Sequence, residues 1–426
     1  MQINNGQLFS FMVLAALASG SSTAADEVNY DESLVPHFEL PDPLTTEDGQ
    51  IVDSVELWQS VRRPEILSLF EASVFGRLPE VDGRLRVRLH ERTETPDGTV
   101  IREQQTIYLT DQDTGPSINV LIYTPAHAAG PVPAFLGLNF GGNHTVDSSS
   151  AIRLPTSWVR KDDRMHTTSN QASELSRGVR ASRWDVQQIV GRGYGLVTAY
   201  YGDIDPDFDD SFQNGIHQLD PEKGTERAAD AGGSISAWSW GLSRILDTLE
   251  THPRVDGRRV AVFGHSRLGK TSLWAGATDQ RFALVISNNS GCGGAALSRR
   301  RFGETVKRIN TVFPHWFCRK HRDYNDNEKM MPVDHHQLIA LIAPRPVYVA
   351  SAAEDRWADP HGEMLSVYHA GPVYALFGKA GLPSDKKPEV DKPVMTDVGY
   401  HVRSGRHDVT PYDWRQYLDF ADQHLK

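Results

Sequence analysis

A serine lies between a β-rich run and a helix-compatible run in the segment Arg258–Gly276 (RRVAVFGHSRLGKTSLWAG). Ser266 in this strand-turn-helix order is typical of a nucleophile elbow, which exposes a serine at the carboxyl edge of a sheet. The helix N-terminus and the next backbone amide can stabilise an oxyanion there. The pattern is G-x-S-x-x-G, with Leu268 at the usual glycine position and Gly269 one residue later. A serine that opens a helix can also be a simple N-cap, so the motif needs partners downstream.

Candidate partners follow in the order Ser, acid, His that α/β-hydrolases use. Pro346–Ser351 reads as a buried strand, and Glu354 and Asp355 follow it within four residues. Near the end of the sequence a strand, a glycine turn and a final helix place His407 on the last strand-to-helix loop. His401, inside that strand, is the nearest competitor. The spacing favours His407 as the base.

These residue types fit acyl transfer. A serine hydroxyl is a weak nucleophile, so His407 would accept its proton and return it to the leaving group, while a carboxylate orients the imidazolium. Arg267, directly after Ser266, places a cation where negative charge develops. Lys270 lies one helical turn after the serine and can line the same pocket. If Ser266 is not catalytic, Arg267 would simply pair with a surface acid and Lys270 would be a solvated residue of the helix.

The surrounding pattern predicts a doubly wound α/β sheet with an antiparallel start. Alternating runs separated by turn signals over Leu85–Pro125 predict strands joined by hairpins. Helical patterns are predicted over Glu56–Phe70, with a break at Pro64, and over Ser234–Glu250, which has one apolar face. Fully buried parallel strands are predicted at Pro133–Asn139, Gly195–Tyr200, Arg259–Gly264, Phe282–Ser287 and Pro346–Ser351.

The composition excludes several classes of protein. The chain has 426 residues, a formal net charge of −11 and 23% charged residues, which is ordinary for a globular protein and excludes collagen-like, coiled-coil and wholly disordered chains. The acidic balance argues against a nucleic-acid partner. Only two cysteines occur, and Asp334-His335-His336, the one dense cluster of ligand-type residues, lacks an H-E-x-x-H frame. We therefore expect neither a metal nor another cofactor.

The first 25 residues suggest export. Leu8–Ala18 is apolar and too short to span a bilayer, and small residues follow it, as in a signal peptide, although no Lys or Arg precedes it. No other segment is long and apolar enough to cross a membrane, so we expect a periplasmic or secreted protein. Residues 26–426 are then expected to form a single domain, with the polar stretch 144–183 as a loop insertion near the site.

Several blocks of the sequence resemble the glucuronoyl esterases, carbohydrate esterases of the α/β-hydrolase superfamily, and in particular their bacterial branch. The blocks occur in the family's order from about Glu65 onward: NFGGNHT, RGYGLVTAYYGDIDPD, GHSRLGK, NNSGCGGAALSRRRFGETVKRIN, FPHWFC, AEDRWADPHGE and GRHDVTPYDW. The resemblance implies a three-layer α/β-hydrolase fold with a mostly parallel central sheet. It also implies hydrolysis of the ester between (4-O-methyl-)glucuronic acid branches of glucuronoxylan and lignin alcohols, or of methyl glucuronate esters.

The resemblance also implies site residues. Ser266 matches the family's nucleophile, His407 its base and Arg267 the arginine that assists the oxyanion. Lys270, Glu304 and Trp357 match positions that hold the uronate sugar. Lysine and glutamate can hydrogen-bond sugar hydroxyls, and an indole can pack on a sugar face. Outside the family, Glu304 would be a helix-surface acid and Trp357 a loop aromatic.

One position departs from the family pattern. Many members carry the triad acid as Glu at the end of the strand after the nucleophile helix, and Asn289 stands there in this sequence. An amide can orient a histidine but cannot neutralise an imidazolium. Asp355 matches a second acid position found in bacterial members, so we expect a triad of Ser266, His407 and Asp355, with Glu354 as runner-up.

Three further expectations stay open on sequence grounds. The same triad could serve an acetyl xylan esterase, a peptidase or another serine hydrolase, and Asn289 also leaves room for an inactive carbohydrate-binding pseudoenzyme. Cys292 and Cys318 flank the helix expected to carry Glu304, and in an exported protein they are expected to form a disulfide, with two unpaired buried thiols as the alternative. No heptad or edge-strand signal demands assembly, so we expect a monomer.

Overall fold

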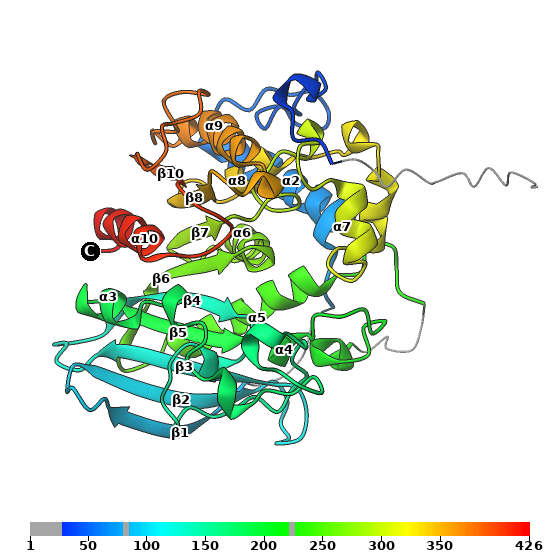
Figure 1. Cartoon of the computed structure of the whole chain (residues 1–426). Coiled ribbons are helices and arrows are strands. Elements are labelled where there is room, and N and C mark those ends of the chain that lie inside the picture. Colours follow the sequence, from blue (N-terminus) through cyan, green and yellow to red (C-terminus); the bar gives the residue numbers. More distant parts are fainter. Residues whose placement is uncertain (1–27, 80–84, 221–225) are drawn as a thin grey trace, which may run out of the picture.

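A ten-stranded sheet runs through the molecule in the order β1-β2-β3-β5-β4-β6-β7-β8-β10-β9 (Figure 1). The computed structural model describes residues 28–79, 85–220 and 226–426. The strands are β1 (Arg86–Glu94), β2 (Val100–Tyr108), β3 (Ser117–Pro125), β4 (Val132–Asn139), β5 (Gly195–Tyr200), β6 (Val255–His265), β7 (Leu284–Asn288), β8 (Val347–Ala352), β9 (Val394–Met395) and β10 (Val398–Arg403).

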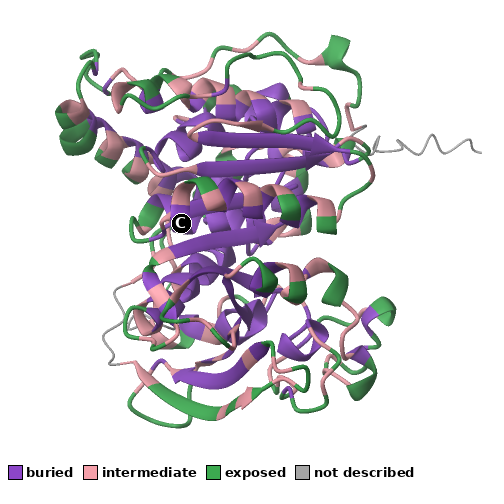
Figure 2. Ribbon diagram, turned by 90° about the vertical axis from the view of Figure 1, so that its left-hand side faces the viewer, coloured by how far each residue is buried: buried purple, intermediate pink, exposed green. Residues whose placement is uncertain are grey.

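The sheet has an antiparallel part and a parallel part. β1, β2 and β3 pair antiparallel, and β3 pairs antiparallel with β5. From β5 through β4, β6, β7, β8 and β10 all pairs are parallel, and the short edge strand β9 is antiparallel again. The predicted hairpins and the five predicted parallel strands are therefore confirmed. The parallel strands are buried, as their continuous apolar runs require, whereas the edge strand β1 is mostly exposed (Figure 2).

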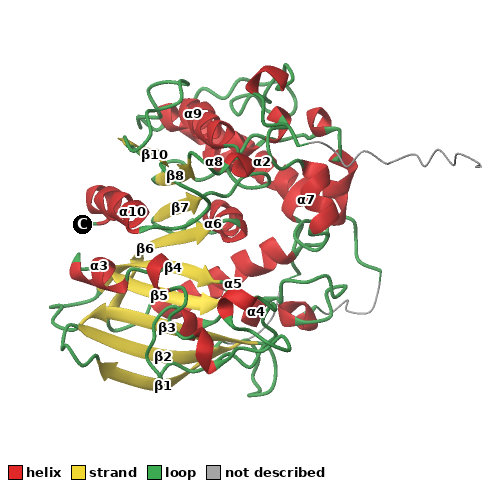
Figure 3. Ribbon diagram, viewed as in Figure 1, coloured by secondary structure: helices red, strands yellow, loops and turns green. Residues whose placement is uncertain are grey.

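Helices cover both faces of the sheet, which gives three layers (Figure 3). α3 and α10 pack on one face, and α5, α6, α8 and α9 belong to the opposite layer. The helices are α1 (Val55–Leu57), α2 (Arg63–Phe70), α3 (Val186–Gly191), α4 (Tyr201–Ile204), α5 (Ser234–Leu249), α6 (Arg267–Thr278), α7 (Val306–Val312), α8 (His335–Ala340), α9 (Pro360–Leu376) and α10 (Pro411–Leu425).

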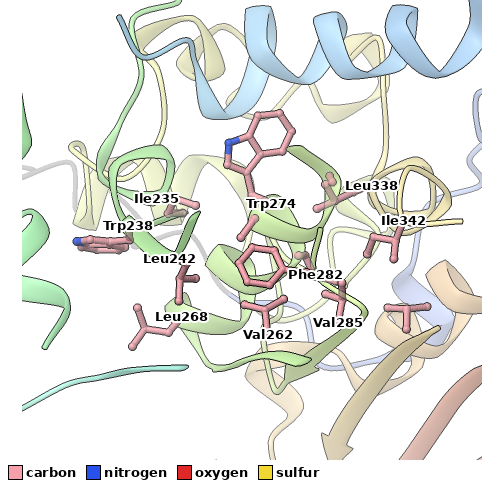
Figure 4. Close-up of a cluster of buried hydrophobic side chains, with 14 of the residues drawn as sticks. Ile235, Trp238, Leu242, Val262, Leu268, Trp274, Phe282, Val285, Leu338 and Ile342 are labelled. Atoms are coloured by element: carbon pink, nitrogen blue, oxygen red, sulfur yellow. The ribbon is translucent and has the colours of Figure 1, made fainter. Parts of the chain in front are cut away.

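Alternation along the central strands builds two separate cores. In β6, Val260 and Val262 belong to the core on the α5–α6 side, and Ala261 and Phe263 belong to the core on the α3–α10 side. This is the period of two that places successive side chains on opposite faces. In the larger core, Ile235, Trp238 and Leu242 of α5 pack with residues of β6, α6, β7 and α8. Figure 4 shows part of this core and labels Ile235, Trp238, Leu242, Val262, Leu268, Trp274, Phe282, Val285, Leu338 and Ile342.

The predicted helix break at Pro64 is wrong. The chain stays helical from Val55 to Phe75, with α1 and α2 joined by a π-helical turn at Trp58–Arg62 and followed by another at Glu71–Phe75. Pro64 lies at the start of α2, directly after the π-helical turn Trp58–Arg62. The wider π turn before it lets the helix continue.

The polar stretch 144–183 contains only short turns of helix in the structure. The 3-10 turns Asn143–Thr145, Asp163–Met165, Glu174–Ser176 and Ala181–Arg183 are linked by loops. Arg177 ties the stretch together, because its guanidinium donates to the carbonyls of Ser149 and Ile152 at 3.0 and 2.6 Å. The stretch connects β4 to α3, so it leaves the sheet at the carboxyl end of a parallel strand.

The predicted disulfide between Cys292 and Cys318 is wrong. Cys292 and Cys318 are both buried free thiols. The ring of Phe317 packs against the backbone beside Cys292, and a Cβ on Gly293 would lie 2.4 Å from it. Cys318 directly precedes the 3-10 turn Arg319–Tyr324, and its amide donates to the carbonyl of Val74, in the helical turn after α2, at 3.0 Å. Burial raises the pKa of both thiols, so both stay protonated at neutral pH.

Other predictions concern the N-terminus and the acid-histidine cluster. The proposed signal peptide, residues 1–25, lies outside the described residues. Within the described ranges, no helix is long and apolar enough to cross a bilayer, and no group of three or more His, Cys, Asp or Glu side chains is arranged to hold a metal ion. Asp334 caps α8, accepting from the backbone amide of His335 at 2.8 Å.

Candidate active site

Ser266 occupies the sharp turn between β6 and α6. Its backbone has φ 59° and ψ −130°, an unfavourable conformation for a residue with a side chain. The turn is held by neighbouring strand β7, since the Ser266 amide donates to the carbonyl of Asn288 at 2.9 Å. At Gly264, an added Cβ would lie 1.8 Å from the carbonyl oxygen of Leu268. The first glycine of the motif is therefore needed for the close approach of strand and helix.

The unusual glycine position has a packing explanation. Gly269 lies against the loop after β7, where an added Cβ would come 3.0 Å from the Cβ of Ser290. Leu268, at the usual glycine position, is buried in the core on the α5 side. The helix thus makes its close contact one residue later than in the common motif.

His407 and Asp355 meet at the same end of the sheet. His407 lies in the loop between β10 and α10, and its Nδ1 is 2.6 Å from Oδ2 of Asp355, just after β8. Burial alone would raise the pKa of Asp355, but the hydrogen bonds from His407 and Asn289 and the charge of His407 lower it below its usual value. The carboxylate therefore stays ionised beside the imidazole.

The two competitors are placed elsewhere. The side chain of Glu354 is 59% exposed and its nearest cation is Arg406, at 3.4 Å. His401 is fully buried between Asp413, 3.0 Å from its Nε2, and the hydroxyl of Tyr348, 2.9 Å from its Nδ1. Of the two acids, only Asp355 contacts His407.

Asn289 contributes to this arrangement without being an acid. Its side-chain amide donates to Oδ2 of Asp355 at 2.8 Å, the same oxygen that faces His407. Asn289 also takes a positive φ of 47°, which asparagine tolerates better than most residues. The residue that departs from the family pattern thus orients the carboxylate that the later loop supplies.

Arg267 is fixed by a buried carboxylate that the sequence did not point to. Asp207 is fully buried and accepts a hydrogen bond from the Arg267 guanidinium. Nε1 of Trp316 donates to the same carboxylate at 2.8 Å, and Nε2 of His315 lies 2.9 Å from it. Burial opposes ionisation, yet Arg267 and the other donors hold the pKa of Asp207 far below its usual value. In the sequence, Asp207 comes shortly after a predicted buried strand, and this position is the one signal that could have marked Asp207 as a site residue.

Lys270, Glu304 and Trp357 form a second polar group near the serine. Nζ of Lys270 donates to the carbonyl of Ser290 and lies 4.0 Å from Glu304, with both side chains nearly buried. Glu304 precedes α7 rather than lying within a helix, and its amide donates to the carbonyl of Trp357 at 3.0 Å. Burial raises the pKa of Glu304 and lowers that of Lys270, although each charge partly offsets the effect on the other.

A second histidine lies behind His407. The ring centroids of His265 and His407 are 4.5 Å apart, and Nδ1 of His265 is 2.6 Å from the side-chain oxygen of Asn288. Burial, together with the charges of His407 and Arg183, holds the pKa of His265 well below its usual value. His265 is therefore a neutral ring that supports His407 without adding charge. Its position next to Ser266 was the available sequence signal.

Ser266, Arg267 and His407 line one pocket of about 470 Å³. Side chains of the 144–183 stretch line it as well, among them Arg160, Asp162, Arg164, Arg180 and Arg183. A strand-to-helix serine, a histidine on the last such loop and an acid after β8 at one edge of a mostly parallel sheet define an α/β-hydrolase.

Comparisons with known proteins identify the family within this class. The family model described as glucuronyl esterase of fungi matches residues 226–378. A carbohydrate esterase from an unknown prokaryotic organism is 51% identical over 404 residues, which cover 93% of this chain and 92% of that protein. The 4-O-methyl-glucuronoyl methylesterase 1 of Wolfiporia cocos is 34% identical over 81% of this chain and 74% of its own length.

A solved structure agrees with these relatives. The glucuronoyl esterase from Solibacter usitatus superposes with a TM-score of 0.88 at 45% identity, covering 92% of this chain and all of that chain. The chain belongs to the glucuronoyl esterase family, as its sequence blocks indicated.

Proposed function

We propose that this protein is a serine esterase that hydrolyses the ester between (4-O-methyl-)glucuronic acid branches of glucuronoxylan and lignin alcohols, and methyl glucuronate esters. One observation carries the proposal: Ser266, in its strained turn, lines the same pocket as His407, and His407 is paired with Asp355. The family relatives support the substrate class, because one is named a 4-O-methyl-glucuronoyl methylesterase.

In the proposed reaction Ser266 attacks the ester carbonyl while His407 accepts the hydroxyl proton. Asp355 holds Nδ1 of His407 and stabilises the imidazolium, so that Nε2 faces the serine. The amide of Arg267, the first residue of α6, and the Arg267 guanidinium stabilise the oxyanion. His407 then protonates the leaving alcohol, and water attacks the acyl-enzyme by the reverse sequence.

The acyl group is proposed to lie against Lys270, Glu304 and Trp357. Lys270 and Glu304 offer a donor and an acceptor that are nearly buried, so hydrogen bonds to sugar hydroxyls form away from competing water. This polar pair suits a hydroxyl-rich uronate better than an acetyl group, which needs a small apolar pocket. Asp355 lies beside His407 and supplies the negative charge that Asn289 lacks, which argues against an inactive pseudoenzyme.

The test compares methyl glucuronate with acetylated xylan as substrates. We expect the wild-type protein to hydrolyse the glucuronate ester with a far higher kcat/KM than acetylated xylan. Ser266→Ala should lower hydrolysis of the glucuronate ester by about 10³-fold or more, because no other group replaces the nucleophile. Ser366→Ala, at a buried serine of α9, is the matched control and should keep activity. Preference for acetylated xylan, or full activity in Ser266→Ala, would contradict the proposal.

The setting of the reaction is part of the same proposal. The apolar stretch near the N-terminus supports export to the periplasm or medium, where plant cell-wall esters are accessible. We also propose that one chain suffices for activity, since Ser266, His407 and Asp355 all come from it.

A further inference from the structure

The pocket beside Ser266 has a wall rich in arginine. The 144–183 stretch contributes Arg160, Arg164, Arg180 and Arg183 to its lining, and Arg267 adds a fifth guanidinium. Asp162 is the one acid among the described residues that line this pocket. Positive charge concentrated in a concave site raises the local concentration of anions.

Most of these arginines already have a carboxylate partner. Arg164 pairs with Asp162 at 2.8 Å, and Arg183 pairs with Asp408 at 2.5 Å. Asp207 is shared by Arg267 and Arg160. These pairs limit how much of each guanidinium is available to a ligand.

Arg180 differs from its neighbours. Within the described part of the chain, its guanidinium makes no hydrogen bond or ion pair, and its Nε is buried without a partner. Burial lowers the pKa of Arg180, and the charges of Arg183 and Arg164 lower it further. The charges of Asp162 and Asp408 act in the opposite direction. The two terminal nitrogens of Arg180 are not among the buried atoms without a partner, so an anion in the pocket can pair with them and offset the positive charge of the neighbouring guanidiniums.

The residues that line the pocket indicate which part of a substrate lies near Arg180. Lys270, Glu304 and Trp357, proposed to hold the acyl sugar, are not among the described residues that line the arginine-rich pocket. Ser266 and His407 belong to that lining. The arginine side chains therefore face the alcohol, which is the part of the ester that leaves after His407 protonates it.

We propose that Arg180 forms an anion subsite for the leaving alcohol, so that the enzyme prefers glucuronate esters whose alcohol carries a carboxylate. The planar guanidinium fork matches a carboxylate in two parallel hydrogen bonds. This inference rests on the proposed function, because it assigns one half of the pocket to the alcohol of that same ester.

The test uses two esters of glucuronic acid that differ by one group, the benzyl ester and the 4-carboxybenzyl ester. We expect the wild-type enzyme to show a higher kcat/KM for the carboxylated ester, and the preference to shrink at high salt. Arg180→Gln should lower kcat/KM for the carboxylated ester by about tenfold and change the benzyl ester less than about twofold. Arg180→Lys should keep part of the preference, since it keeps the charge but loses the fork.

Arg258→Gln is the charge-matched control, because Arg258 is 92% exposed and absent from the pocket lining. It should leave the ratio of the two rates unchanged. An equal loss on both esters in Arg180→Gln, or no wild-type preference, would overturn the subsite. If the wild-type protein hydrolysed neither ester, the proposed function itself would fail; hydrolysis of both at equal rates would remove only the subsite.

Discussion

One oxygen of Asp355 links three residues of the proposed triad region. Oδ2 of Asp355 lies 2.6 Å from Nδ1 of His407 and accepts from Asn289 at 2.8 Å. The amide and the imidazole hold the carboxylate from two directions. A glutamate at position 289 would instead place a second negative charge beside Asp355, which is unfavourable at this distance.

Asp355→Asn tests this residue. We expect kcat/KM on methyl glucuronate to fall by about 10³-fold or more, because asparagine neither stabilises the imidazolium nor fixes the productive tautomer. Glu354→Gln is the adjacent control and should stay within about twofold of wild type, since Glu354 is mostly exposed. Loss of activity in Glu354→Gln with retention in Asp355→Asn would assign the acid to Glu354.

Asp207 is expected to act through Arg267. Asp207→Asn removes the buried countercharge of Arg267, so we expect kcat to fall by about 10²-fold with little change in KM. A double-mutant cycle with Arg267→Gln measures the coupling: the second substitution should add little to the first. Additive losses would mean that Asp207 supports the fold rather than the position of the arginine.

At the scale of elements, the β6–α6 turn depends on a close approach that only glycine allows. Gly264→Ala would press its Cβ against the carbonyl of Leu268, 1.8 Å away in the present geometry, so the helix start must shift. We expect a loss of about 1–3 kcal/mol in the free energy of unfolding together with reduced kcat. Thermal unfolding and ester hydrolysis measure the two effects. Gly130→Ala, at an exposed position with no atom within 4 Å of the added Cβ, should change neither.

The loop after β7 is a second element that organises the site. Glu363 of α9 accepts from the amides of Ser290 and Gly291 at 2.7 and 2.9 Å, and burial raises its pKa to about 7. The carbonyl of Ser290 in turn accepts from Lys270. This loop therefore connects the α9 layer to Asn289 on one side and to the proposed sugar-binding lysine on the other.

At the scale of the whole molecule, buried carboxylates predict how stability depends on pH. Asp413 at the start of α10 accepts from Arg403 at 2.8 Å and lies 3.0 Å from Nε2 of His401. Burial alone would raise its pKa, but these partners lower it. A depressed folded-state pKa adds stability that is present above the unfolded value, about 3.9, and is lost as pH falls through the folded value.

Thermal unfolding between pH 6 and pH 3 measures this dependence. We expect the wild-type Tm to fall steeply below about pH 4. Asp413→Asn should lower stability near pH 6 by about 3 kcal/mol, because Arg403 loses its buried partner, and should give a shallower fall in acid. Asp111→Asn, at an exposed aspartate, should keep the wild-type slope. A variant at Asp413 with an unchanged slope would assign the acid sensitivity to other carboxylates.

The sequence by itself determined the sheet, the family and the order of the proposed triad. Buried runs and alternation are local signals, so the hairpins, the five parallel strands and α5 could be predicted from them. The Ser–acid–His order placed Ser266, the adjacent acids Glu354 and Asp355, and His407 at strand ends. The blocks that resemble a family also predict the family's fold, because they contain the strands and turns that build the same core.

Only the tertiary structure decided what depends on distance between segments remote in the chain. The two cysteines are buried and unpaired, and Pro64 is accommodated beside a π turn rather than ending a helix. The choice of Asp355 over Glu354, the countercharge of Arg267 at Asp207 and the unpaired Arg180 follow from side-chain direction and burial. Sequence spacing fixes none of these three, because a one-residue difference turns a side chain from the pocket to the solvent.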